Sequence, residues 1–338
     1  MEVEPFSVEL ATPLETAAGA VREREGFLVR LEYAGTEGVG EASPLLGWTE
    51  TYEECREALA RAAEVAEHTD WGVALTKTEA PAARHALALA LQEALARAAS
   101  EPLYRGLGGE GTVRAVPVNA TLSDAAPEET ATAAVDAVAE GFGCLKLKVG
   151  ARSVESDLER VRAVRERVDA PLRLDANGAW TRDQAERVVD AVADLGIDYV
   201  EQPLPAEDLD GHAALRGRGV DIAVDESLAA YDVEQVLEAG AADVVVLKPM
   251  VLGGPDLARE AATAAREAGV EPVVSTTIDT VVARTGAVHL AASVPGIGPC
   301  GLATGSMLRS DLAPDPATVE DGHIAVPQGP GLGLPTRP

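Results

Sequence analysis

Lysine is nearly absent from this sequence, because only four of the 338 residues are lysines, at positions 77, 146, 148 and 248. Lysine and arginine together number 28 against 56 aspartates and glutamates, and the formal net charge is −28 at pH 7. Such a surface repels nucleic-acid phosphates and anionic lipid, so we expect neither kind of partner. Two explanations fit the composition: a halophilic source, whose carboxylates keep the surface solvated in a salt-loaded cytosol, and a genome rich in G and C.

Cysteine and long apolar runs are scarce as well. The three cysteines, Cys55, Cys144 and Cys300, lie far apart without a CxxC pair, so the sequence predicts neither a disulfide framework nor a zinc knuckle. Charges, proline or glycine interrupt every apolar stretch before it reaches membrane-spanning length. The first ten residues contain acids and no basic region, unlike a signal peptide. We therefore expect a cytoplasmic protein.

Residues 1–112 mix strand and helix patterns. Alternating apolar residues predict a strand at 26–35, and a second strand is expected at 39–47 after a turn. Stretches rich in alanine and leucine predict helices at 51–68 and 80–99. This part is expected to form an α+β domain.

Residues 113–304 alternate short β-rich runs with helical stretches, which predicts βα units around a parallel sheet. The expected strand ends are 23 to 29 residues apart, at Asn119, Lys148, Asp175, Glu201, Asp225, Lys248, Ser275 and Gly301. Eight such repeats predict an α/β fold of the (β/α)8 type, a TIM-like barrel, whereas a doubly wound sheet would want a GxGxxG turn. Residues 305–338, rich in proline and glycine, are expected to pack back against the first domain.

Two of the four lysines occupy a strand that otherwise reads as core, GCLKLKVG at 143–150. Alternation along this strand puts Lys146 and Lys148 on the face inside the barrel, and the intervening leucines face the surrounding helices. Alone, a KxK pair is more often a solvated strand edge, and the acids after later strands are more often turn or helix-start residues. Their succession on strand ends favours a site, because active sites of such barrels form there.

Three carboxylates are expected to converge at these ends, from Asp175, Glu201 and Asp225. Ionised carboxylates this close repel each other unless a cation joins them, and oxygen-only ligands favour Mg²⁺, with Mn²⁺ as a substitute. Lys148 and Lys248 would flank the substrate from opposite sides. We predict that the cation Lys146 lowers the pKa of Lys148 and makes it a usable base. Abstraction of a proton α to a carboxylate, with the metal stabilising the enediolate, suits this set.

Seven more residues at or beside strand ends are expected to contact the substrate: Asn119, Asn177, Ser275, Thr276, Thr277, Gly301 and Leu302. Trp48 and Arg24 could close over the site, although ordinary packing or solvation is the simpler interpretation for each. None of the five histidines ends a predicted strand, so a base pair of one lysine and one histidine is not expected.

The sequence resembles the enolase superfamily, in its muconate lactonizing enzyme subgroup, over nearly the whole chain. GEASPLLG and PLYRGLGG are similar to capping-domain patterns of that family, and KLK, LDANGAW, VEQP, VDES and LKP match its ligand and base strands. The resemblance implies a modified barrel, an N-terminal capping domain completed by the C-terminal segment, and a small-molecule carboxylate substrate. It implies metal ligation by Asp175, Glu201 and Asp225. It implies catalysis by Lys146, Lys148 and Lys248, and leaves a homo-oligomer open.

Within the subgroup, the end of the barrel is most similar to the o-succinylbenzoate synthases, which often show a run like SSxxES followed by GLxT. Here residues 275–280 read STTIDT, with Asp279 at the usual glutamate, and GLAT follows. A dipeptide epimerase is expected to carry acids on the eighth strand for the substrate's amino group, and CGLATG has none.

The resemblance implies syn elimination of water from 2-succinyl-6-hydroxy-2,4-cyclohexadiene-1-carboxylate, a step of menaquinone biosynthesis. Lys148 would take the α-proton and then protonate the leaving hydroxide, while Lys248 stays cationic. The alternatives are an N-acylamino acid racemase, a dipeptide epimerase or a muconate-type cycloisomerase on the same lysines. A non-catalytic, metal-holding barrel is a further alternative of another class.

Overall fold

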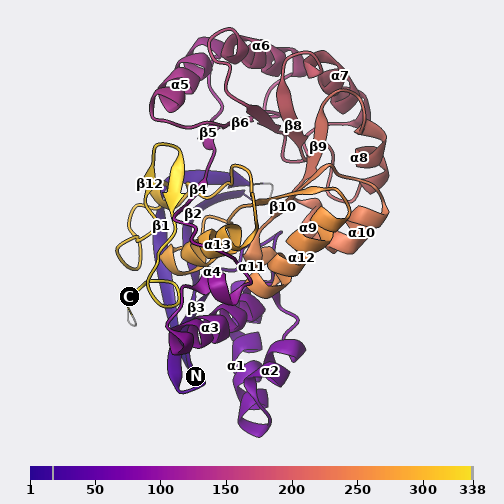
Figure 1. Ribbon diagram of the computed structural model, residues 1–338. Helices are drawn as coiled ribbons and strands as arrows, with labels where there is room; N and C mark the ends of the chain where they lie inside the picture. Colours follow the sequence, from indigo (N-terminus) through magenta and orange to yellow (C-terminus); the bar gives the residue numbers. More distant parts are fainter. Residues whose placement is uncertain (17–18, 336–338) are drawn as a thin grey trace.

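The computed structural model describes residues 1–16 and 19–335 (Figure 1). Its N-terminal part is an antiparallel sheet in the order β1-β2-β3, followed by helices: β1 Glu2–Thr16, β2 Gly19–Tyr33, β3 Thr36–Ala42, α1 Tyr52–His68, α2 Trp71–Lys77 and α3 Pro81–Ala99. A Cβ atom on Gly38 would lie 1.9 Å from the carbonyl oxygen of Ala90, and one on Gly40 equally close to that of Ala86. Glycines in β3 therefore let α3 lie directly against the sheet.

A parallel sheet of seven strands forms the barrel, in the order β11-β10-β9-β8-β7-β6-β5. Its strands are β5 Ala120–Leu122, β6 Leu145–Lys148, β7 Leu172–Asp175, β8 Ile197–Glu201, β9 Asp221–Val224, β10 Val244–Leu247 and β11 Glu271–Val274. The larger helices of this part are α5 Pro127–Ala139, α6 Val154–Arg165, α7 Arg182–Val192, α8 Leu209–Leu215, α10 Val233–Glu238, α12 Pro255–Glu267 and α13 Val281–Ser293. Three single turns are α4 Leu103–Gly106, α9 Ser227–Ala230 and α11 Pro249–Leu252.

The eighth position of the barrel is reduced to two bridge residues. Cys300 pairs in parallel with Val118, and the next residue, Gly301, pairs in parallel with Ser275 after β11. These contacts join the two edges of the seven-stranded sheet, so the predicted barrel architecture is confirmed. The expectation of eight full strands is wrong, because the last unit forms single bridges in place of a ladder.

Strand alternation separates two kinds of surface in the barrel. Leu145 and Leu147 have no exposed surface and pack in one cluster with side chains of the surrounding helices. Inside the barrel, a small apolar cluster is formed by Tyr199, Ala223, Val244 and Val273. The interior is thus closed by side chains below the level at which the strands end.

A buried polar contact, which we call the cap junction, joins β3 to the start of α13. Glu41 is fully buried, and its Oε1 accepts from Thr280 N at 2.9 Å while its Oε2 accepts from Ala283 N at 2.8 Å. Arg24 on β2 donates to the carbonyl oxygen of Ile278 at 3.3 Å. Ile278 has a φ of +62°, which is unfavourable for a β-branched residue, so this contact holds a strained loop in place.

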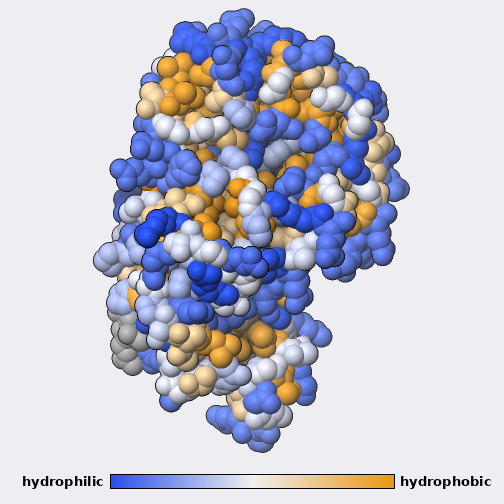
Figure 2. All heavy atoms as spheres, viewed as in Figure 1, coloured by the Kyte–Doolittle hydropathy of each residue, from blue (hydrophilic) through white to orange (hydrophobic). Residues whose placement is uncertain are grey.

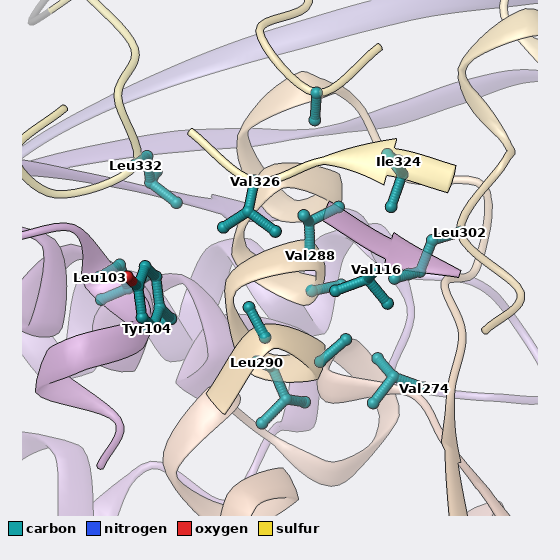
Figure 3. Close-up of a cluster of buried hydrophobic side chains, with 14 of the residues drawn as sticks. Leu103, Tyr104, Val116, Val274, Val288, Leu290, Leu302, Ile324, Val326 and Leu332 are labelled. Atoms are coloured by element: carbon teal, nitrogen blue, oxygen red, sulfur yellow. The ribbon is translucent and has the colours of Figure 1, made fainter. Parts of the chain in front are cut away.

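The C-terminal segment contacts both the barrel and the first helices. It contains η1 Gly305–Met307, β12 Val319–Glu320 and β13 His323–Ala325, and β13 pairs antiparallel with β4 Ala115–Pro117. The backbone of Leu103 donates to Gly331 O at 2.7 Å, and Leu332 N donates to the Glu93 carboxylate at 2.6 Å. Figure 3 shows the shared core beneath, to which Leu332, Ile324 and Val288 all contribute. The domain boundaries at residues 112 and 304 stay predictions.

Sequence patterns missed β1, α2 and the single turn α4 in the first part. The expected strand at 39–47 is shorter and earlier, since β3 ends at Ala42. No helix in the described ranges 1–16 and 19–335 has the length and apolar character needed to cross a bilayer. On the face shown in Figure 2, hydrophilic residues cover most of the surface, and apolar residues gather over α5, where Val135 and Val138 are exposed.

Candidate active site

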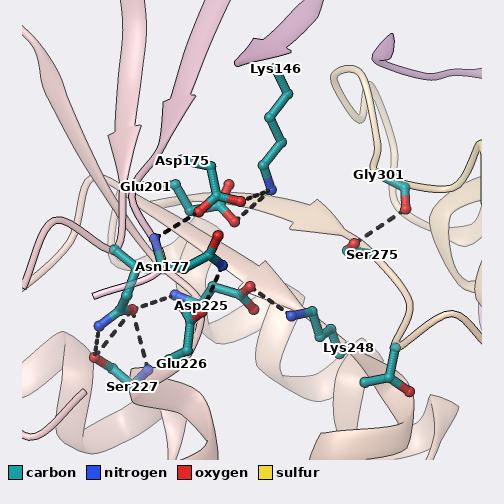
Figure 4. A network of polar contacts seen from close by, with 12 residues as sticks. Lys146, Asp175, Asn177, Glu201, Asp225, Glu226, Ser227, Lys248, Ser275 and Gly301 are labelled. Atoms are coloured by element: carbon teal, nitrogen blue, oxygen red, sulfur yellow. Dashed lines mark hydrogen bonds and ion pairs between the residues drawn. The ribbon is translucent and has the colours of Figure 1, made fainter. Parts of the chain in front are cut away.

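The two lysines of β6 meet carboxylates of the next two strands, and Figure 4 shows Lys146 reaching Asp175 and Glu201. The ammonium of Lys146 lies 2.6 Å from Glu201 Oε1 and 2.9 Å from Asp175 Oδ2. Lys148 Nζ lies 2.6 Å from the same Asp175 oxygen and donates to Asn177 Oδ1 at 2.8 Å. The strand register explains why these side chains are close, because Lys148 is paired with Asp175 on the next strand, and Asp175 with Glu201 on the one after.

The third carboxylate and the third lysine form a second group opposite β6. Asp225 follows β9, and its Oδ2 accepts from Lys248 Nζ at 2.6 Å. Lys248 follows β10, and its ammonium lies 3.5 Å from the centre of the Trp48 ring, a cation–π contact. Trp48 belongs to the loop after β3, so the first part of the chain supplies one wall of the site.

Burial and mutual charge perturb these groups strongly. Burial alone opposes ionisation of Asp175, but Lys146 and Lys148 outweigh it and hold its pKa well below the usual range. Burial, helped by the charge of Asp175, raises the pKa of Glu201 to about 7. Burial likewise raises the pKa of Asp225, although Lys248 opposes the shift. Lys146 is partly buried, which opposes its charged form, yet the Asp175 and Glu201 carboxylates raise its pKa well above the ordinary value.

Three buried carboxylate oxygens in this region have no hydrogen-bond partner: Glu201 Oε2, Asp225 Oδ1 and Glu226 Oε2. In the described part of the chain, every other buried carboxylate oxygen has a hydrogen-bond partner. Unpaired buried acceptors are costly, and a cation would satisfy them. Within the same ranges no three His, Cys, Asp or Glu side chains form a ready metal cage, because ammonium groups lie between these carboxylates. The donor set nevertheless fits a hard divalent cation, since every free atom is a carboxylate oxygen.

The residues predicted to contact substrate divide into two sets. Asn177 lies among the site side chains. Ser275, after β11, pairs with Gly301 of the last barrel unit, and Ser275 Oγ donates to Gly301 O at 3.2 Å (Figure 4). Thr276 bonds Thr304, and Thr277 donates to the carboxylate of Asp279. These side chains follow β11.

Two of those residues lie elsewhere, which corrects the prediction. Asn119 precedes β5 and does not end it; its side chain accepts from Arg173 at the amino-terminal end of the barrel. Leu302 is fully buried in the hydrophobic core with Val116 and Val288 and does not line the site (Figure 3).

A sequence profile described as enolase C-terminal domain-like matches residues 129–338, more than half of the chain. The chain belongs to the enolase superfamily. The first part matches a profile described as the MenC N-terminal domain, over residues 5–94. The resemblance drawn from the motifs is therefore confirmed, and the protein is an enzyme of this superfamily.

Relatives within the superfamily carry several activities. The chain is 35% identical to the o-succinylbenzoate synthase of Thermobifida fusca, over 94% of this chain and 86% of that one. It is 31% identical to the L-Ala-D/L-Glu epimerase of Bacillus subtilis, over 99% and 95% of the two chains. The dipeptide epimerase of Enterococcus faecalis, solved with Mg and the dipeptide L-Leu-L-Tyr, superposes with a TM-score of 0.86 at 30% identity, covering 98% of each chain.

Two residues of this enolase-superfamily site, Glu226 and Trp48, were not among the predicted site residues. Glu226 follows Asp225 directly and was not named as a candidate; it precedes α9, and its Oε1 accepts from the Asn177 side chain at 2.8 Å. Trp48 was given the simpler interpretation of packing, and it contacts Lys248. The two adjacent acids in VDES could have indicated Glu226 as a site residue. Trp48 and Lys248 are 200 positions apart, so no local sequence pattern could have predicted their contact.

Proposed function

We propose that the protein is an o-succinylbenzoate synthase, which removes water from 2-succinyl-6-hydroxy-2,4-cyclohexadiene-1-carboxylate. The observation that carries this proposal is the pair of lysine amines, Lys148 and Lys248, on either side of buried carboxylates with free oxygens. Such a pair suits removal of a proton α to a carboxylate.

Each side chain then has a distinct task. Lys148, with a side chain that is 39% exposed, takes the α-proton and returns a proton to the departing hydroxide on the same face. Lys248 remains an ammonium, held between the Asp225 carboxylate and the Trp48 ring, and faces the developing negative charge. Lys146 keeps its proton and fixes the carboxylates of Asp175 and Glu201.

The side chains of Asp175, Glu201 and Asp225 would hold Mg²⁺. When bound, the cation supplies positive charge for the carboxylate of the substrate as its α-proton leaves. The unpartnered oxygens of two of these ligands, Glu201 Oε2 and Asp225 Oδ1, support this choice. The Mg present in the structure of the Enterococcus faecalis relative is a further reason to test this ion first.

The loop after β11 and the eighth position favour a substrate without an amino group. Residues 300–305 contain no acid. Asp279 is the nearby carboxylate in sequence, and it is 2% exposed and bonded to Thr277. A substrate ammonium would thus lack a free acidic partner in this segment, whereas a succinyl group needs none. The MenC-type first domain points the same way.

A direct assay of the dehydration tests this proposal, with Mg²⁺ and high KCl. We expect turnover by the wild type and a loss of about 10²–10⁴-fold in Lys148→Ala, the usual share of a general base. Lys248→Ala should also lose turnover, while Lys77→Ala, at an exposed position outside the site, should retain it. No aromatic product from the wild type would refute the proposal.

Racemisation or epimerisation on the same lysines is the second candidate, favoured by full-length similarity to the Bacillus subtilis epimerase. N-succinyl amino acids and dipeptides in D₂O distinguish the two, because a racemase or epimerase exchanges the α-hydrogen. Exchange without dehydration would replace the first proposal with this one.

A further inference from the structure

We propose that Glu226 is a positioning residue for Lys148 and acts through the side chain of Asn177. Its importance for turnover rests on the proposed function, in which Lys148 moves the proton. The arrangement itself is a chain of three side chains, Glu226, Asn177 and Lys148, from β6 and the loops after β7 and β9. Figure 4 shows the contact between Asn177 and Glu226.

The Asn177 amide is held at both ends by partners of opposite kind. Its Nδ2 donates to Glu226 Oε1 at 2.8 Å, and its Oδ1 accepts from Lys148 Nζ at 2.8 Å. Turning the amide over would lose both bonds, since only the nitrogen donates and only the oxygen accepts. Glu226 therefore determines which end of Asn177 faces the lysine.

The backbone of Asn177 is fixed as well. Its N–H donates to Asp175 Oδ1 at 3.1 Å, and its φ is +45°, a left-handed conformation that asparagine tolerates better than most residues. With the backbone fixed, the remaining freedom is rotation of the side chain. The bond to Glu226 removes that freedom.

Lys148 needs the hydrogen bond to Asn177 because its other partner, Asp175, is also a proposed cation ligand. Lys148 Nζ also contacts Asp175 Oδ2, one of the proposed cation ligands. A divalent cation on Asp175 competes with the ammonium for this carboxylate. Asn177 Oδ1 is a neutral acceptor outside that competition, so it keeps the amine in position on its flexible stem.

Steady-state kinetics of Glu226→Ala and Glu226→Gln test the role in turnover. Glutamine keeps an oxygen that accepts from Asn177, so we expect near wild-type kcat. Alanine lets the amide turn, and we expect kcat to fall about tenfold or more with little change in KM, as for a misplaced base. Combined with Asn177→Ala, the Glu226→Ala loss should not add, because both changes break one chain of contacts.

A second measurement needs no turnover and uses the scarcity of lysine. Brief acetylation with the N-hydroxysuccinimide ester of acetate, followed by peptide mass spectrometry, compares Lys148 with exposed Lys77 in the same molecule. With Mg²⁺ present, Glu226→Ala should raise the Lys148-to-Lys77 ratio about threefold or more, the weight of one hydrogen bond. Glu226→Gln should leave the ratio unchanged.

The labelling result decides the positioning role even if the dehydration assay fails, so the two proposals can fail separately. Equal ratios in wild type and Glu226→Ala would overturn the positioning role. So would a loss of Mg²⁺ affinity of tenfold or more in Glu226→Gln, measured by calorimetry, because Glu226 would then act as a cation ligand. Melting temperatures of the variants identify any loss that is due to unfolding.

Discussion

The proposed site and the cap junction both bury carboxylates beside cations, but they treat the carboxylate oxygens differently. In the cap junction, Glu41 accepts four hydrogen bonds, from Ser43 Oγ, Thr280 N, Thr280 Oγ1 and Ala283 N. In the site, Glu201, Asp225 and Glu226 each retain an oxygen without a partner. A structural carboxylate has all its oxygens hydrogen-bonded by groups of the same protein. A buried carboxylate that keeps an oxygen without a hydrogen bond is suited to binding a ligand.

The same substitution in the two regions should have unequal consequences, and Glu41→Gln should have the larger effect on stability. The two backbone donors, Thr280 N and Ala283 N, bond different oxygens of Glu41. An amide has only one oxygen, so one buried N–H must face an NH₂ group. We expect the free energy of unfolding to fall by about 3 kcal/mol, measured by urea denaturation. Unchanged stability would show that the cap junction is not saturated as described.

Glu201→Gln should leave stability nearly unchanged and strongly reduce the stabilisation by Mg²⁺. Its Oε1 accepts from Lys146 while Oε2 has no partner, so an amide fits without losing a bond. At a Mg²⁺ concentration of 100 times Kd, wild type should gain about 2.7 kcal/mol. The variant should gain far less, by thermal denaturation with and without Mg²⁺. An equal gain in both would remove Glu201 from the ligand set.

His289 on α13 is an exception, because its Nδ1 is buried without a partner while its Nε2 lies 3.3 Å from Leu332 O of the C-terminal segment. Burial lowers its pKa from 6.5 to about 4. The unfolded chain therefore binds a proton first as the pH falls, and stability is lost from about pH 6.5 towards pH 4. By pH 5 this loss is about 2 kcal/mol, and His289→Gln should avoid it. Urea denaturation at pH 7.5 and pH 5 should show a smaller decrease for the variant; parallel decreases would contradict this assignment.

Added salt should change the stability of the proposed site and the cap junction least, because it acts mainly on exposed charges. Raising KCl from 0.1 to 1 M shortens the screening length from about 10 Å to about 3 Å and weakens repulsion among exposed acids. We expect a rise in Tm of about 2–4 °C, equivalent to about 1 kcal/mol. Wild type and Glu41→Gln should shift in parallel. A fall in Tm with added KCl would refute the halophilic interpretation of the composition.

Local rules predicted the lysines and carboxylates of the site well, for a physical reason. Alternation along β6 and the nearly constant length of one βα unit are properties of short segments, so they survive without knowledge of the tertiary fold. Lys148, Asp175 and Glu201 end their strands where the spacing put them. Their catalytic and ligand roles stay predictions.

The rules failed where distant segments intervene. Asn119 was predicted to end a strand from the repeat spacing before Lys148. In the structure the preceding strand β4 pairs with β13 near the C-terminus, and β5 starts only at Ala120. Glu226 comes after the end of β9, where the backbone turns helical (φ −59°, ψ −29°) and strand alternation no longer gives the side-chain direction. In residues 2–10, by contrast, alternation was visible and could have predicted β1.

The two-residue closure of the barrel also bears on how the chain acquires its shape. Val118 and Cys300 are separated by 182 positions (300 minus 118), whereas β6 and β7 pair across a single helix. Neighbouring units can therefore assemble one after another from β5 onward, but the ring cannot close until the eighth unit has been made. The segment from Lys146 to Lys248 precedes that last step, so the proposed chemical groups can come together while the barrel is still an open, curved sheet on the growing chain.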